Sequence, residues 1–101
     1  MTRQDYLLTC LMEESAELAM ACSKAIRFGA DDICPATRQD AGKTAKQRIT
    51  EEYIDVTALY LMLQNCCIIH MSQDEVSEAI EAKSERVEDT IKLALERGIV
   101  K

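Results

Sequence analysis

The chain has 101 residues, of which 48% are hydrophobic and 30% charged, proportions typical of one globular domain rather than of a disordered segment. Its net charge of −6 disfavours binding to nucleic acid, and three Gly and one Pro are too few for a strand-rich fold with many tight turns. No basic segment followed by an apolar run begins the chain and none of the five cysteines has zinc-site spacing, so we expect a cytoplasmic protein with reduced, mostly buried thiols.

Three segments begin with a helix start signal. In each, Thr or Ser is followed three residues later by an acidic residue or Gln, which is typical of a capping box; the first residues of these signals are Thr2, Thr44 and Ser72. We therefore predict an all-α fold in a single domain over residues 1–101, with long helices at residues 3–28, 45–71 and 73–97. Residues 30–43 are predicted to form a loop, with one additional short helical turn near Thr37.

The predicted helices differ in their apolar faces. One broad apolar side of the first helix contains Leu7, Leu8, Leu11, Leu18, Cys22, Ala25 and Ile26. The second helix is apolar on every side between residues 53 and 69, and residues 56–71 are too few for a membrane span. Two partner helices of one small chain cannot cover such a helix, so we expect a homodimer or a dimer of dimers to complete a helical bundle.

The first two predicted helices carry three acidic residues each at one spacing, i, i+1, i+4. The two sets are Glu13, Glu14 and Glu17, and Glu51, Glu52 and Asp55. At this spacing the carboxylates of one helix point within about 100° of arc, so helices that face each other would gather up to six acidic groups.

The two acidic sets have different surroundings. The glutamates of the first helix lie opposite its aliphatic side, so that set alone is explained equally well as a solvated face. The second set continues into apolar positions and is expected at the rim of a buried face, with no Lys or Arg within its own turn. Clustered carboxylates there are costly unless protons or cations neutralise them, and Mg²⁺ prefers oxygen ligands of this kind. Together the two sets predict a divalent-metal site.

The predicted third helix carries Lys83 and Arg86 one turn apart. Lys83 interrupts an apolar stripe that runs from Val76 to Ala94. It either extends past the edge of the core, as part of a solvated salt-bridge face, or meets the acidic cluster or a phosphate. Its place on the stripe favours the second interpretation.

The order EExxE, then ExxD, then KxxR resembles the MazG-like branch of the all-α nucleoside triphosphate pyrophosphatase superfamily. The resemblance covers the three predicted helices. It implies hydrolysis of nucleoside triphosphates between the α and β phosphates, which gives a nucleoside monophosphate and pyrophosphate. It also implies Mg²⁺ as cofactor, with Mn²⁺ able to replace it.

The residue roles implied by the resemblance follow the motif positions. The implied metal ligands are Glu14, Glu17, Glu52 and Asp55. Glu13 is implied as a general base or as a support of the ligands, and Lys83 and Arg86 as catalytic groups that hold phosphate oxygens. Tyr6 and Phe28 are candidates for stacking on the nucleobase, although either position is more often simple packing.

Three other interpretations remain open. The first is a non-catalytic helical adaptor or regulatory dimer, in which the acidic residues are only part of the solvated surface. The second is a biosynthetic enzyme similar to phosphoribosyl-ATP pyrophosphatase. The third, a ferritin-like di-iron protein, needs Glu-x-x-His pairs, whereas His70 is the only histidine and Cys67 precedes it at that spacing.

Overall fold

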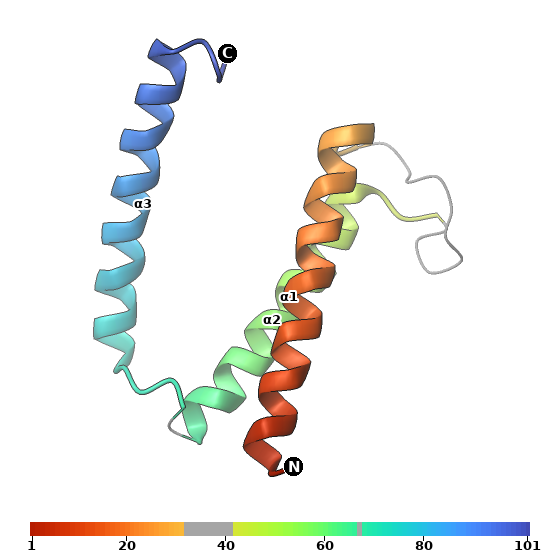
Figure 1. Ribbon diagram of the computed structural model, residues 1–101, viewed down its shortest axis with the longest axis vertical. Coiled ribbons are helices and arrows are strands. Elements are labelled where there is room, and N and C mark those ends of the chain that lie inside the picture. Colours follow the sequence, from red (N-terminus) through yellow and green to blue (C-terminus); the bar gives the residue numbers. More distant parts are fainter. Residues whose placement is uncertain (32–41, 67) are drawn as a thin grey trace. The chain divides into compact units, whose positions relative to one another are not determined.

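The computed structural model describes residues 1–31, 42–66 and 68–101. Within these ranges the helices are α1 (Arg3–Phe28), α2 (Ala45–Asn65) and α3 (Gln73–Glu96), as Figure 1 shows. The predicted all-α fold is confirmed. The short turn predicted near Thr37 lies outside the described residues.

Each helix begins with a capping box, in which the residue before the helix and the third helical residue exchange hydrogen bonds. The three pairs are Thr2–Asp5, Thr44–Gln47 and Ser72–Glu75. In the first pair, the Asp5 amide donates to Thr2 Oγ1 at 3.1 Å and the Thr2 amide donates to Asp5 Oδ2 at 2.9 Å. Each of these bonds pairs a backbone amide that has no partner within the helix. The capping signals correctly predicted all three helix starts.

A glycine follows the end of α1 and of α3, and both ends lie close to the predicted ones. Gly29 has φ 92° and its amide donates to Ala25 O, so α1 ends at Phe28 as predicted. Gly98 has φ 73°, and α3 ends at Glu96, one residue before the predicted end. Glycine adopts such positive φ angles without a steric penalty.

The predicted end of the second helix at residue 71 is wrong, because α2 ends at Asn65. The amides of Ile68 and Ile69 both donate to Leu63 O, at 3.1 and 3.3 Å, and these bonds replace the helical pattern. No Gly or Pro lies between residues 65 and 71. The chain therefore leaves the helix through residues that carry no stop signal, and His70 lies in the connection.

The described chain divides into two compact units, Met1–Ile69 and His70–Lys101. In the first unit, α1 and α2 lie side by side and run in opposite directions (Figure 1). The second unit contains α3, which has no buried residue. The prediction of one domain over residues 1–101 stays a prediction.

The packed face of α1 differs from the predicted one. Leu7 and Ala21 are buried, and Glu14 lies midway between them at seven-residue intervals, which return to nearly the same side of a helix. In contrast, Ile26 is 86% exposed and Leu8 is 37% exposed. Glu14 was therefore wrongly placed opposite the packed side, because α1 contacts α2 through a row that includes it, whereas Glu13 and Glu17 are exposed.

On α2 the buried positions are Ala45, Glu52 and Leu63. Other sides of this helix carry exposed apolar residues, among them Ile54 at 58% and Leu61 at 44%. The first unit alone therefore does not cover α2 on every side. This agrees with the apolar pattern of the sequence, while homo-oligomerisation stays a prediction.

Two further expectations concern cysteines and membranes. Cys10 and Cys66 are half-buried free thiols, but Cys22 is exposed, so the expectation of mostly buried thiols is wrong for Cys22. Cys34 and Cys67 lie outside the described residues. Among the described helices, none combines the length and the apolar character required to cross a membrane.

Candidate metal centre

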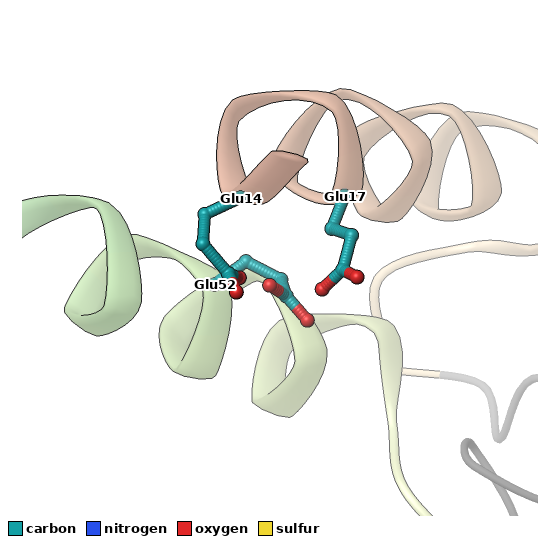
Figure 2. Close-up of side chains that lie close together, drawn as sticks. All are labelled: Glu14, Glu17 and Glu52. Carbon is teal, nitrogen blue, oxygen red and sulfur yellow. The ribbon is translucent and has the colours of Figure 1, made fainter. Parts of the chain in front are cut away.

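The packing of α1 on α2 brings together three carboxylates, those of Glu14, Glu17 and Glu52. One oxygen from each residue lies within 4.8 Å of the others. Glu14 and Glu17 are one turn apart on α1, and Glu52 approaches them from α2 (Figure 2). We call these three residues the carboxylate trio. It unites members of both acidic sets, as the sequence predicted.

The trio lies at the edge of the packed interface. Glu52 is only 2% exposed, Glu14 is half-buried and Glu17 is exposed. The Oε2 atoms of Glu14 and Glu52 are shielded from solvent and accept no hydrogen bond from the described residues. Buried oxygens without a donor are unfavourable, and either a proton held between the two carboxyl groups or a cation would satisfy them.

Electrostatics favour the protonated form when no cation is bound. Burial, followed by the charge of Glu17, raises the pKa of Glu14 to about 7, and a proton on Glu14 can be shared with Glu52. Burial also raises the pKa of Glu52, although the Arg48 guanidinium opposes this shift. A divalent cation would replace the proton and remove the repulsion among the trio.

Arg48 contacts a member of the trio, and the sequence interpretation did not include it among the candidates. Its Nη2 donates to Glu52 Oε1 at 2.8 Å and its Nη1 donates to Glu51 Oε2 at 3.1 Å. Lys43 Nζ also donates to Glu51 Oε2, at 3.0 Å, and this bond is the main cause of the lowered pKa of Glu51. The acidic turn of α2 therefore has basic neighbours just outside it, and Glu51 pairs with them. The spacing of Arg48 and Glu52, i and i+4, was the available signal.

The remaining acidic candidates lie beside the trio. Asp55 is exposed, and its charge contributes to the raised pKa of Glu14. Glu13 is exposed and adjacent to Glu14 in the chain. Neither belongs to the trio, so the roles of Asp55 as a ligand and of Glu13 as a base stay predictions.

The two aromatic candidates lie at opposite ends of α1. Tyr6 is 62% exposed near its start, and Phe28 is 39% exposed at its last residue, with the Arg27 guanidinium 5.3 Å from its ring centroid. At about 1.5 Å per residue, they are separated by roughly 33 Å along the helix. One nucleobase therefore cannot stack on both residues of the same chain.

Lys83 and Arg86 lie on α3, in the second unit. With Val87, Thr90 and Ile91 they line a shallow open pocket. Their spacing on one helix is as predicted, and their role toward phosphate stays a prediction.

The chain was compared with family models, curated proteins and solved structures, and none of them matches. The resemblance to MazG-like enzymes therefore rests on the order and spacing of the acidic and basic motifs.

The trio fits a hard divalent cation by its donor set and its burial. All three side chains offer carboxylate oxygens, which Mg²⁺ and Mn²⁺ prefer over nitrogen or sulfur ligands. The shielded Oε2 atoms of Glu14 and Glu52 are two such ligand atoms, and neither has a hydrogen-bond partner among the described residues. Glu17 is exposed, so water and a ligand would be able to reach a cation held by the trio.

Proposed function

We propose that this protein is a Mg²⁺-dependent hydrolase of nucleoside triphosphates that releases pyrophosphate and a nucleoside monophosphate. The observation that carries the proposal is the carboxylate trio, with its two shielded oxygens that lack a hydrogen-bond donor. The trio supports a cation site. The choice of nucleoside triphosphates rests on the resemblance of the motif order to MazG-like enzymes.

In this proposal each of the motif residues has a separate chemical task. Glu14, Glu17 and Glu52 hold the cation, and the exposed Asp55, whose charge acts on Glu14, is proposed to join them when substrate is bound. The bound Mg²⁺ supplies neutralisation of phosphate charge and lowers the pKa of water. Glu13, exposed beside Glu14, accepts the proton of the attacking water. Lys83 and Arg86 hold phosphate oxygens through charge-assisted hydrogen bonds.

The test is a panel of ribonucleoside and deoxyribonucleoside triphosphates, with phosphoribosyl-ATP included, assayed for pyrophosphate release with Mg²⁺, with Mn²⁺ and with EDTA. We expect release from at least one nucleoside triphosphate, supported by either cation and abolished by EDTA. Preference for phosphoribosyl-ATP would assign the chain to the biosynthetic alternative. No release from any substrate would contradict the enzymatic proposal.

The exposed apolar residues favour a second candidate, a non-catalytic helical adaptor. Ile54 on α2 and Ile80 on α3 are 58% and 62% exposed, and such side chains are typical of surfaces that bind other helices. An adaptor needs no cation at the trio. Binding of Mg²⁺ or Mn²⁺ that is lost in Glu52→Gln would therefore favour the enzyme over the adaptor.

A further inference from the structure

Arg48 binds two neighbouring carboxylates of α2 with different nitrogen atoms. Nη2 lies 2.8 Å from Glu52 Oε1, and Nη1 lies 3.1 Å from Glu51 Oε2. Glu51 is held in turn by Lys43, whose Nζ lies 3.0 Å from its carboxylate. The guanidinium is therefore anchored on a second carboxylate besides Glu52, and the Arg48 side chain is only 20% exposed.

The two oxygens of Glu52 have different surroundings. Oε1 accepts the hydrogen bond from Arg48, whereas Oε2 is shielded from solvent and accepts none from the described residues. The carboxylate of Glu52 converges with those of Glu14 and Glu17 (Figure 2). Because Arg48 occupies only Oε1, a cation can take Oε2 while the ion pair stays in place.

We propose that Arg48 is a positioning residue of the metal centre, which holds Glu52 in the orientation that presents Oε2 to the cation. This inference rests on the proposed metal site. Arg48 orders the Glu52 side chain before the cation arrives, so cation binding does not have to order it. Groups that orient metal ligands in this way are typically worth about 10–100-fold in metal affinity.

A different role for Arg48 predicts the opposite result. If its guanidinium only neutralises Glu52 while no cation is bound, the cation must displace it, and weakening the Arg48–Glu52 pair should tighten cation binding. Arg48→Lys separates these roles because Lys keeps the positive charge. A single ammonium group cannot reproduce the planar fork that contacts Glu51 and Glu52 together.

The experiment measures Mn²⁺ binding to the full chain by the electron paramagnetic resonance signal of free Mn²⁺, with Mg²⁺ as competitor. The proteins are the parent, Arg48→Lys and a matched control, Arg3→Lys, which makes the same substitution at an exposed position of α1. Circular dichroism checks the helical content of each. We expect Arg48→Lys to bind about 10-fold more weakly and Arg3→Lys to bind like the parent.

Equal or tighter binding by Arg48→Lys would overturn the positioning role and leave the metal site intact. A parent that binds no cation would overturn both the metal site and this inference, so the two failures are distinguishable. A second measurement needs no variant: nitrogen-15 NMR of the Arg48 guanidinium in the parent. Slow rotation of the guanidinium is expected both without Mg²⁺ and at saturating Mg²⁺, and rapid rotation on addition of Mg²⁺ would overturn the proposal.

Discussion

Glu14 on α1 faces Glu52 on α2, and each has one carboxyl oxygen that is shielded from solvent and lacks a donor among the described residues. Packing of the two helices keeps these groups together although their charges repel. The interface therefore contains an electrostatic cost that a proton or a cation removes.

Removal of a single carboxylate should abolish most activity without unfolding the protein. We expect at least about a hundredfold loss, a few kcal/mol of transition-state stabilisation, for each of Glu14→Gln, Glu17→Gln, Glu52→Gln and Asp55→Asn. Steady-state rates of pyrophosphate release measure the effect, and Glu78→Gln on the exposed surface of α3 is the control. Parent rates in all four variants would show that the metal site is wrongly placed.

The same variants should differ in stability when no metal is present. Glu14→Gln removes a repulsive charge, so its melting temperature at neutral pH should equal or exceed that of the parent. Glu52→Gln also removes the 2.8 Å ion pair with Arg48, so it should be less stable than Glu14→Gln. Thermal melts by circular dichroism in EDTA make this comparison, and the reverse order would contradict the assigned contacts.

The metal-free protein should lose stability as pH rises through the range in which Glu14 titrates. Its pKa is raised from 4.5 to about 7 in the folded state, so the folded protein binds more protons than the unfolded chain between these values. The resulting stability is complete below pH about 4.5 and is lost by pH about 7. Melting temperatures in EDTA should fall by several degrees over this range, and less in Glu14→Gln. A parent melting temperature that rises over the same range would contradict the burial of Glu14.

The groups with lowered pKa values do not obscure this window. The pKa values of Asp5, Glu51 and Glu75 are lowered by hydrogen bonds, from Thr2, Lys43 and Ser72 respectively. The stability that such groups contribute is present above their unfolded pKa values and is lost only as pH falls through the folded ones. Their effect is therefore confined to more acidic solutions than those in which Glu14 acts.

The sequence predicted helix starts better than helix ends and faces. Capping boxes are local, since both partners lie within four residues, and all three were correct. The end of α2 at Asn65 depends on backbone hydrogen bonds to Leu63 O, and no Gly or Pro in the sequence indicates that the helix ends there. The packed face of α1 was predicted wrongly because Glu14 lies in line with Leu7 and Ala21. A face identified from apolar residues alone leaves out a carboxyl group that is partly buried in it.

The candidate site was predictable to the extent that it depends on motif spacing. The repeated acidic spacing predicted that the two acidic sets meet, and Glu14, Glu17 and Glu52 do lie together. It did not show that Glu51 turns to Lys43 and Arg48, because the direction of a long side chain depends on its neighbours in space. The expected group of up to six carboxylates is therefore smaller: Glu51 pairs with basic residues, and Glu13 and Asp55 are exposed and do not belong to the trio.

Self-association is expected from the apolar surface that α2 leaves exposed. Leu61 and Ile54 lie seven residues apart on one side of this helix, at 44% and 58% exposure. Sedimentation equilibrium at micromolar concentration should show a dimer or tetramer for the parent. Leu61→Glu should shift the equilibrium toward the monomer, because the interface would have to bury its charge. A monomeric parent would contradict the expectation.

A substitution of Lys83 on α3 distinguishes the enzyme hypothesis from the adaptor hypothesis. Lys83→Met keeps the aliphatic stem and removes the charge. In the enzyme, loss of a phosphate contact worth roughly 1.5–3 kcal/mol should lower kcat/KM about ten- to hundredfold with no loss of stability. In an adaptor the change should be neutral or slightly stabilising. A stable variant with parent kinetics would remove Lys83 from the site.

The central claim is tested most directly by the products formed from a nucleoside triphosphate. Phosphorus-31 NMR follows each substrate in the presence of Mg²⁺, with the parent protein and with Glu52→Gln. Glu52 is chosen because it is the most buried member of the trio. We predict equal amounts of pyrophosphate and nucleoside monophosphate with the parent, and unchanged substrate with Glu52→Gln or EDTA. Unchanged substrate with the parent, or a nucleoside diphosphate with inorganic phosphate instead, would contradict the proposed reaction.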